Sequence, residues 1–375
     1  MNCQGWGALC LSNNPWGIGL KLGYLLFFVF SFLCGSNLLA DEAMHDRLSV
    51  RALGMGNAFV AVGGDEGALF YNPAGLKSIK AGLLQFFTAE LHASNTVIDA
   101  AKASDIQSIL SDIAGKKAYA EINADLFSAS GPGWAWSYSK GGFLDLKIDN
   151  PVIPYVTLRA YLQTLAAGGL AFDFNEKVTW GLTVKKITRQ GITQEVHIVD
   201  LAEDTFISSL QDQLVSVSAQ GYDLGFLYRL DKELGFLSTP RVGLVFKNIG
   251  GMDFGATGKL EQSYDLGFAW DAALFELPAI LAIDWLDVSN QRHQAPSYWR
   301  NVNLGSEISW GTQANGKPIV AYRLGMKGPY MSWGFTLNPS YLPITLEYAS
   351  WSQEIGDRAG DVADKRQSMI LSFNW

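Results

Sequence analysis

The feature that most constrains the fold is an alternation of apolar and other residues. It recurs in segments of about ten residues from Leu83 to the C-terminus. In residues 178–184, for example, valine, tryptophan and leucine stand at every second position, with threonine and glycine between them. A period of two is typical of β-strands with two chemically different faces. Both a soluble β-sandwich and a membrane β-barrel show this alternation, so the period alone leaves two fold classes open.

The composition limits the remaining classes. The chain has 375 residues, of which 48% are hydrophobic and only 17% charged, whereas soluble domains carry nearer a quarter. The apolar run 22–34 is too short to cross a bilayer as a helix. A net charge of −8 argues against nucleic acid as a partner.

Counting the alternating segments predicts fourteen strands, an even number that is typical of a bacterial outer-membrane barrel. The expected strands lie near residues 82–92, 124–138, 140–147, 155–174, 178–190, 220–230, 240–248, 262–272, 278–288, 299–310, 317–326, 329–337, 341–352 and 364–375. The two longest connections, 93–123 and 191–219, both follow odd-numbered strands and are therefore expected at the same end. Helical spacing at Ile106–Ile113 and Phe206–Leu214 predicts helices there. They are either small helices on the rim or a lid over a binding pocket.

Two details favour the barrel. The second face of the strands is rich in glycine and small residues with scattered charges, as in a crowded polar lumen. Aromatic residues gather at segment ends, which fits the aromatic girdles of an outer-membrane barrel. The aromatic residues in question are Tyr71, Trp180, Tyr298, Trp299, Trp310 and Trp333.

The C-terminus carries a topology signal of its own. Met369, Leu371, Phe373 and Trp375 alternate with other residues, and the chain ends on the aromatic residue. This ending resembles the signal that the barrel assembly machinery reads in outer-membrane proteins. The assembly machinery is therefore an expected partner.

The first 40 residues are predicted to be a cleaved signal peptide. Lys21 precedes the apolar run 22–34, and Ala40 offers a small residue at the cleavage site. All three cysteines lie before residue 35, so no disulfide is expected in the mature chain. A lipoprotein site at Cys34 is disfavoured by the bulky Leu33, and an N-terminal membrane anchor by the shortness of the run.

Between the cleavage site and the first strand lie two runs, RALGMGNAFVAV at 51–62 and ALFYNPAGL at 68–76. They resemble the N-terminal plug of the FadL-type outer-membrane transporters, which carry long-chain fatty acids and other hydrophobic compounds. They resemble still more closely the related PorV-like barrel proteins. The run GLVFKNIGG at 243–251 also resembles the sequences of these barrel proteins. The resemblance implies a fourteen-stranded barrel over 82–375 with a plug over 41–81, and an apolar or amphipathic ligand. The mature chain is shorter than a typical fatty-acid transporter, and none of that group's substrate-contacting residues is identified by motif.

The residues of the predicted plug suit a chain that turns compactly inside a lumen. Asn72, Pro73, Ala74 and Gly75 are expected to form a gating turn, because Asn and Pro start turns and small residues permit close backbone approach. The plug glycines are Gly54, Gly56, Gly63 and Gly64. The alternative is an ordinary glycine-rich surface loop. A nucleotide-binding interpretation of residues 54–56 lacks the third glycine.

The sequence offers no chemistry for catalysis. Its four histidines, His45, His92, His197 and His293, are far apart, and no nucleophile elbow or phosphate-binding loop is present. No catalytic residue, metal or cofactor is therefore expected. A mixed-charge cluster over 357–366 either binds divalent cations or lipopolysaccharide, or is a hydrated rim.

The sequence thus predicts a barrel in the outer membrane of a Gram-negative-type bacterium, for passive uptake of hydrophobic or amphipathic small molecules under control of the plug. The alternative is a PorV-like structural or shuttle barrel of a secretion or surface-attachment system. Expected partners are outer-membrane lipids, a hydrophobic small-molecule ligand and, for the alternative, secretion-system proteins. An apolar tunnel would favour the first hypothesis. An exposed groove over a plugged lumen would favour the second.

Overall fold

A computed structural model describes residues 45–102, 117–148, 155–197, 214–231, 237–291, 298–313, 316–356 and 358–374. The predicted signal peptide and Trp375 lie outside the described residues. Within the described ranges, no helix combines the length and the apolar character needed to cross a membrane.

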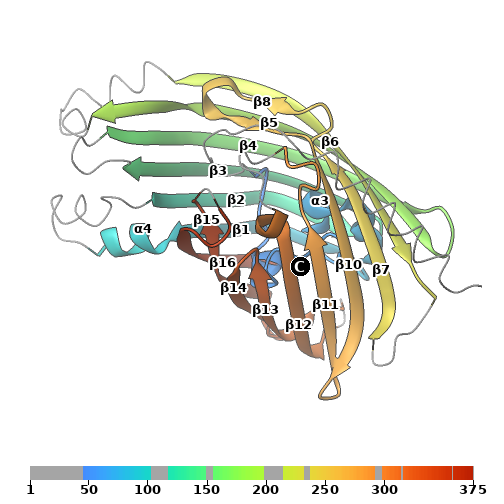
Figure 1. Cartoon of the computed structure of the whole chain (residues 1–375). Coiled ribbons are helices and arrows are strands. Elements are labelled where there is room, and N and C mark those ends of the chain that lie inside the picture. The colour runs from blue at the N-terminus through green and yellow to red at the C-terminus, as the bar shows by residue number, and fades with distance from the viewer. Residues whose placement is uncertain are drawn as a thin grey trace, which may run out of the picture. The chain divides into compact units, whose positions relative to one another are not determined.

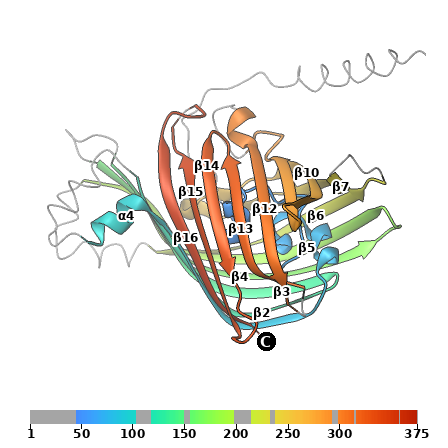
Figure 2. The same ribbon diagram turned by 90° about the horizontal axis from the view of Figure 1, so that it is seen from below.

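Fourteen antiparallel strands close into a barrel, which confirms the predicted fold class and strand number (Figure 1). Each strand pairs with the next barrel strand along the chain, and β1 pairs with β16 to close the ring. Figure 2 shows β12–β16 side by side. The barrel strands are β1 (Leu83–Ser94), β2 (Lys117–Gly131), β3 (Trp134–Ile148), β4 (Tyr155–Asp173), β5 (Val178–His197), β6 (Val215–Arg229), β7 (Leu237–Lys247), β10 (Ser263–Leu274), β11 (Leu277–Trp285), β12 (Val302–Thr312), β13 (Pro318–Lys327), β14 (Tyr330–Leu337), β15 (Ile344–Glu354) and β16 (Ala363–Asn374).

The connections differ between the two ends of the barrel. At the end where β1 begins and β16 ends, here called the turn end, β2 and β3 are joined by two residues and β10 and β11 by two. The opposite end, here called the loop end, holds the longer connections 95–116, 198–214 and 248–262. This division agrees with the expected parity, except that β13 and β14 are joined at the loop end by residues 328–329 alone.

The predicted boundaries of the second and third strands are wrong. Residues 117–123, expected in a connection, belong to β2, and the chain turns at 132–133 within the expected strand 124–138. Pro132 cannot donate a ladder hydrogen bond, and Gly133 has φ +84°, a left-handed conformation that favours glycine. The start of β2 does not show a clear apolar row, because inward Tyr119, Glu121 and Asn123 alternate with outward positions of which only Ile122 is a large apolar residue.

The strands β2–β6 form a taller part of the wall. They have 15 to 20 residues each, whereas β14 has 8 and β12 has 11. Beside β6 the connection 248–262 folds inward, with β8 (Met252–Asp253), η3 (Gly255–Thr257) and β9 (Lys259–Leu260). It contacts β4, β5 and β6. α4 (Asn95–Ala100) follows β1, and η4 (Tyr298–Asn301) precedes β12.

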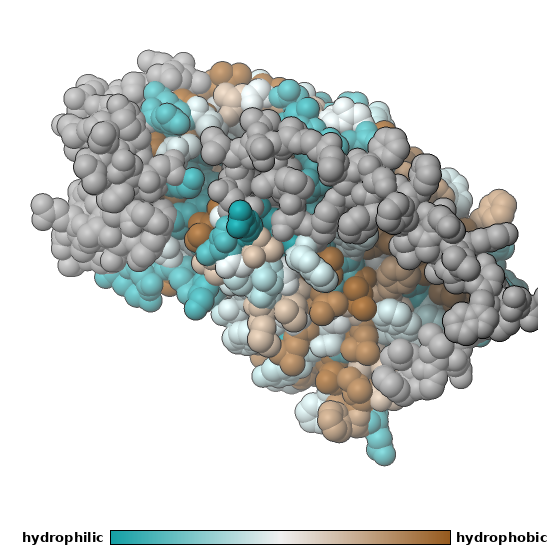
Figure 3. Space-filling model, in the orientation of Figure 1, coloured by the Kyte–Doolittle hydropathy of each residue, from teal (hydrophilic) through white to brown (hydrophobic). Residues whose placement is uncertain are grey.

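The outer face of the strands is apolar. Leu182 on β5, Leu304 on β12 and Leu324 on β13 are among the large hydrophobic side chains that are 39%, 40% and 59% exposed. Figure 3 shows apolar side chains gathered over the region of β11 and β12 on the visible face. This is the opposite of a soluble sandwich, in which such residues turn to the core. The alternation therefore places apolar residues outside and small or polar residues inside.

The aromatic residues expected in the girdle divide into two groups. Trp180, Trp299, Trp310 and Trp333 are exposed on the outside, while no side chain is described for Tyr298. Tyr71 is a correction, because it is 6% exposed and lies inside the barrel. Its hydroxyl donates to Asn57 Oδ1 at 2.5 Å, which satisfies the polar tip of a buried tyrosine.

Candidate functional site in the barrel lumen

Residues 45–81, here called the N-terminal segment, lie inside the barrel, where the strands enclose them (Figures 1 and 2). The segment contains α2 (Val50–Gly54), α3 (Ala68–Tyr71) and η1 (Pro73–Ser78). The Ser49 hydroxyl caps α2 by accepting from the Ala52 amide. α2 contacts β13–β16, and η1 contacts β3–β6 on the other side. The segment thus bridges opposite walls, and its apolar residues supply much of the buried core.

The wall is shaped to receive this segment. At Gly225, a β-carbon would lie 2.0 Å from Asn72 Oδ1, and at Gly181 it would lie 2.4 Å from the Pro73 carbonyl carbon. Only glycine allows the backbone to approach so closely. Further wall glycines whose β-carbon would meet the segment in this way are Gly169, Gly243, Gly267, Gly305, Gly325 and Gly334. The glycine-rich second face seen in the sequence is therefore the seat of the segment.

The predicted gating turn packs closely against that seat. The Asn72 side chain accepts from the Ala74 amide at 3.1 Å, and its Nδ2 donates to the carbonyls of Val60 at 2.9 Å and Phe226 at 3.1 Å. Asn72 thus ties η1 both to the preceding turn of the segment and to β6. Gly75 lies against Gly63, where a β-carbon on either would meet the other.

The predicted plug glycines have different roles. Gly56 has φ +65°, and a β-carbon there would lie 2.4 Å from the Leu304 carbonyl. Gly63 and Gly64 also have positive φ. Gly54 ends α2 and packs against Gly334, without an unusual dihedral.

Ion pairs fasten the start of the segment to both sides of the barrel. Arg47 Nη2 lies 2.6 Å from Asp125 on β2 and 3.2 Å from Glu90 on β1. Asp46 pairs with Lys185 on β5, whose ammonium also lies 2.8 Å from Asp223 on β6. The two adjacent residues of the segment therefore hold strands that lie well apart around the ring.

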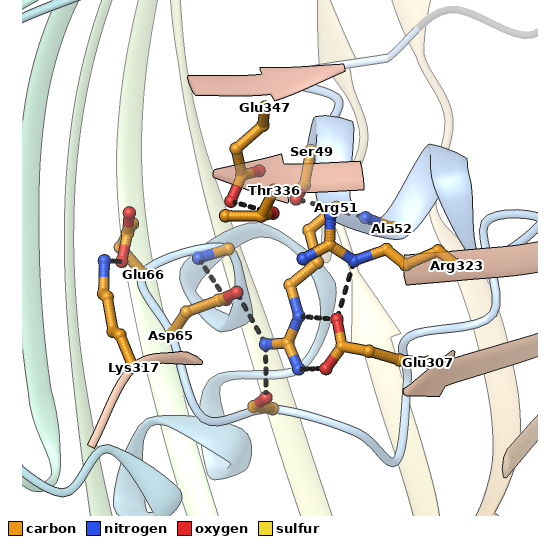
Figure 4. A network of polar contacts seen from close by, with 12 residues as sticks. Ser49, Arg51, Ala52, Asp65, Glu66, Glu307, Lys317, Arg323, Thr336 and Glu347 are labelled. Carbon is orange, nitrogen blue, oxygen red and sulfur yellow. Dashed lines mark hydrogen bonds and ion pairs between the residues drawn. The ribbon is translucent and has the colours of Figure 1, made fainter. Parts of the chain in front are cut away.

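A second ionic group fastens α2 to β12 and β13 (Figure 4). Arg51 donates through Nε and Nη2 to the two carboxylate oxygens of Glu307, at 2.8 and 2.6 Å. It also lies 2.8 Å from Asp65 of the same segment. Arg323 Nε approaches the same Glu307 at 2.6 Å. One wall carboxylate thus serves two guanidinium groups, a bidentate geometry that favours arginine.

Asp284 on β11 holds the middle of the segment. Its Oδ2 accepts from the backbone amides of Phe59 and Val60, at 2.5 and 2.7 Å. Asp284 is completely buried. Backbone amides inside a lumen have no water to bind, so a wall carboxylate that satisfies two of them stabilises the buried turn.

The pKa values of the three carboxyl groups of the segment, Asp46, Asp65 and Glu66, are not shifted in the same direction. Burial raises the pKa of Asp46, but the Lys185 and Lys247 ammonium groups outweigh it and hold that pKa well below its usual range. Burial also raises the pKa of Asp65, and the Arg51 guanidinium does not fully offset it, so this pKa stays above its usual range. Burial acts in the same sense on Glu66, but the Lys317 ammonium lowers its pKa.

A cavity of about 580 Å³ lies beside the segment toward the turn end. Its volume is in the range of small-molecule sites. Part of its wall is apolar, with Leu69, Phe70, Ile79 and Leu83. The rest carries charge, with Arg51, Arg323, Glu307, Asp65, Glu66, Lys317 and Glu347. The cavity is amphipathic and is not the purely apolar tunnel that the transport hypothesis anticipated.

Toward the loop end, cationic and aromatic side chains form a row across the lumen. Arg189 lies 4.5 Å from the Tyr161 ring and 4.4 Å from the Phe254 ring. Tyr161 stacks on Phe143 at 4.5 Å, and Arg366 lies 3.6 Å from the Tyr119 ring. The row runs through Lys327, Trp351, Arg366, Tyr119, Phe143, Tyr161, Arg189 and Phe254. Sequence patterns missed it because its members come from seven strands and from the connection 248–262.

The remaining predicted sites are placed as follows. Met369, Leu371 and Phe373 of β16 all face outward and are partly exposed. The mixed-charge cluster over 357–366 is not a single cluster, because Asp364 and Arg366 pair inside the barrel at 2.7 Å. Most of both expected loop helices lies outside the described residues, although Leu214 is described and is not helical. In the part of the chain that the structure covers, no three His, Cys, Asp or Glu side chains could hold a metal ion.

No protein-family model matches the sequence, and no curated protein sequence matches it. The structure is similar to the CymD monoaromatic hydrocarbon channel, with 12% identity, a TM-score of 0.47, and coverage of 86% of this chain and 96% of that one. It is also similar to a Pseudomonas aeruginosa FadL homologue, with 11% identity, a TM-score of 0.46, and coverage of 91% and 99%. The Pseudomonas putida toluene transporter TodX has 9% identity, a TM-score of 0.46, and coverage of 90% and 99%. Because these likenesses are distant, the function is inferred below from the chain's own geometry.

Proposed function

We propose that the chain is an outer-membrane β-barrel for passive uptake of amphipathic or hydrophobic small molecules, with the N-terminal segment as its plug. The observation that carries the proposal is the amphipathic cavity of about 580 Å³ beside the segment, inside a barrel whose outer face is apolar. An apolar exterior over a polar interior suits a barrel surrounded by lipid. In this proposal residues 1–40 are a signal peptide and 41–81 the plug.

The cavity favours a solute with both an apolar and a polar part. Leu69, Phe70 and Ile79 belong to the lining, and against them an alkyl or aromatic group would be removed from water. The lining also carries charged side chains, which need polar partners when water is excluded. A pure hydrocarbon would offer them none, so the polar group of the solute is part of the proposal.

Passage requires that the segment move or loosen. The turn at Asn72 is the proposed gate, because it joins η1 to both Val60 and β6. No energy source is needed for movement of a solute down its gradient. The loop-end row of cationic and aromatic residues would form the outer barrier.

The test is uptake into liposomes that contain the purified barrel. The triple variant Asn72→Gly, Pro73→Gly, Ala74→Gly should change the uptake rate of an amphipathic solute while the barrel still shows heat-modifiable migration. The control replaces Asn175, Glu176 and Lys177 of the β4–β5 turn with glycine. Unchanged uptake by a correctly folded triple variant would contradict gating by this turn.

One observation favours the alternative, a PorV-like structural or shuttle barrel of a secretion or surface-attachment system. The segment is tied by ionic contacts to β1, β2, β5 and β12, together with the amide contacts to β11. This number of contacts favours a segment that stays in the lumen and does not open. If neither the wild type nor the triple variant raises uptake above empty liposomes, the alternative becomes the better assignment.

A further inference from the structure

The charges around the cavity do not balance side chain by side chain. Among the described lining residues, nearly every carboxylate has a cationic partner. Asp65 pairs with Arg51, and Glu66 lies 3.4 Å from Lys317. The other paired lining carboxylates are Glu90, Asp125, Asp271 and Glu307. Glu347 is the exception. It accepts a hydrogen bond from the Thr336 hydroxyl, at 3.1 Å, and no direct ion pair of Glu347 is described in the lining.

Glu347 faces the cavity from β15. Its neighbours across the sheet are Thr336 on β14 and Ile370 on β16, and all three line the cavity. The side chain is half-buried. A half-buried carboxylate without a direct ion pair attracts a cation more strongly than a hydrated one, because less water screens its charge.

A second polar group points to the same place. Arg323 is 2% exposed, and its Nη1 has no hydrogen-bond partner in the described structure. Its Nε is held by Glu307. Figure 4 shows the Arg323 guanidinium between Glu307 and the Thr336–Glu347 pair. A buried donor without an acceptor is costly, so this end of the cavity presents one free donor beside a carboxylate for which no direct ion pair is described.

We propose that Glu347 binds the ammonium group of a cationic amphiphile, while Arg323 Nη1 donates to an oxygen acceptor next to that group. The apolar part of the molecule lies against the lining residues Leu69, Phe70 and Ile79. This inference rests on the proposed function and names the class of solute. A cavity of about 580 Å³ accommodates such a molecule.

An anionic head group fits this end less well. An anion at Arg323 would lie beside Glu307, which already contacts that guanidinium, and close to Glu347. The like charges would repel it. Lys80, the lining cation for which no carboxylate contact is described, is exposed. Its charge is therefore hydrated and attracts an anion only weakly.

The test measures binding of three probes of equal chain length to the full barrel held in amphipol. Hexylammonium, 1-hexanol and hexanoate are titrated calorimetrically against the wild type, Glu347→Gln and the control Glu176→Gln. Glu176 lies in the exposed β4–β5 turn and receives the same chemical change. Heat-modifiable migration checks that each variant is folded.

Hexylammonium should bind the wild type more tightly than hexanol, and hexanoate should bind most weakly. Glu347→Gln should weaken hexylammonium about tenfold, the size of a charged hydrogen bond, and leave hexanol unchanged. Tightest binding of hexanoate by the wild type would overturn the proposal even if the variant did not fold. Equal hexylammonium affinity in Glu347→Gln and Glu176→Gln would also overturn it.

The liposome assay separates this inference from the proposed function. If hexylammonium binds at Glu347 but does not enter liposomes, the site stands and the transport function fails. If all three probes enter at equal rates and bind without preference, transport stands and the ammonium site fails.

Discussion

At the scale of single residues, Asp46 and Asp65 show how neighbours decide the cost of a buried charge. Both are aspartates of the N-terminal segment, and both lie inside the barrel. Asp46 meets two ammonium groups, from Lys185 and Lys247. Asp65 pairs with the Arg51 guanidinium, which also pairs with Glu307, and the carboxylate of Glu66 is next to it. The same carboxyl group is therefore stabilised as an anion at the first position and disfavoured at the second.

Asp46→Asn should lower the free energy of unfolding at pH 7 by about 2 to 4 kcal/mol, because it leaves the buried Lys185 with Asp223 alone. Asp65→Asn should change it by less than about 1 kcal/mol, because the fold disfavours the charged form of Asp65 relative to an ordinary aspartate. The measurement is the urea midpoint of the detergent-folded barrel, followed by tryptophan fluorescence. Equal losses in both variants would contradict the different environments assigned to the two side chains.

The pH dependence of these two variants should differ in sign. The pKa of Asp46 is lowered in the fold, so its stabilisation is present at neutral pH and is lost as the pH falls below the ordinary aspartate range. The pKa of Asp65 is raised, so the wild type gains stability as the pH falls from neutral through that raised value. Asp65→Asn lacks this gain. Urea midpoints at several pH values between 4 and 8 measure it, and parallel curves for Asp65→Asn and the wild type would count against it.

At the scale of elements, the glycines of the wall and the turns of the segment fit each other. Gly225 on β6 faces Asn72, so an alanine there would place its methyl group 2.0 Å from Asn72 Oδ1 and 2.9 Å from Pro73 Cδ. These positions lie on separate strands and turns, and the close approach exists only when the barrel has closed around the segment.

Gly225→Ala should destabilise the barrel by about 1 to 3 kcal/mol, the cost of overpacking, and should loosen the Asn72 turn. The readout is faster cleavage of the segment in limited proteolysis, together with a lower urea midpoint. Gly142→Ala on β3 is the control, because its methyl group would meet Leu162 Cδ2 at 3.6 Å, an ordinary contact. If both variants resist protease as the wild type does, the seat tolerates a methyl group and the close fit is not required.

The strands could be predicted from sequence because each carries its own period of two, and all fourteen predicted segments overlap barrel strands. The contacts between the N-terminal segment and the barrel wall could not be predicted from the sequence. Arg51 and Glu307 are 256 positions apart, and a local pattern does not show which inward charge meets which. The cavity could not be predicted from the sequence for the same reason, because its lining residues come from both ends of the chain. Glu347 has no local signal beyond its inward position in an alternating strand.

The last strand, β16, was predicted to carry the assembly signal. Met369, Leu371 and Phe373 form its outward row, and the sequence continues this row to Trp375. Deleting Trp375 should lower the amount of barrel in outer-membrane fractions, measured by immunoblot against a co-expressed barrel. Phe373→Leu, which keeps the row apolar, should assemble better than the deletion. Wild-type levels after deletion would argue against a terminal aromatic signal.

At the scale of the whole molecule, the two faces of the barrel wall carry different kinds of side chain and make different contacts. The inner face holds the segment through charge and close backbone contact, and the outer face is built for an apolar surrounding. The predicted plug inside the barrel and the predicted lipid-facing exterior thus both follow from the same alternation of residues. A change on one face should leave the other intact, so stability in lipid and control of passage can be tested separately.

The outer face supplies the sharpest test of membrane insertion. Leu182 on β5 lies opposite Leu224 on β6, between Trp180 and Val184 in an outward apolar row. In a bilayer an arginine at the midplane costs about 2 to 4 kcal/mol, and one near the interface costs about 0 to 1 kcal/mol. Leu182→Arg should therefore lower the unfolding free energy in lipid vesicles far more than Phe174→Arg, which lies beside the β4–β5 turn. Both changes add the same charge to an exposed site, so equal losses would show that depth in a bilayer does not matter and that the apolar face meets something other than lipid.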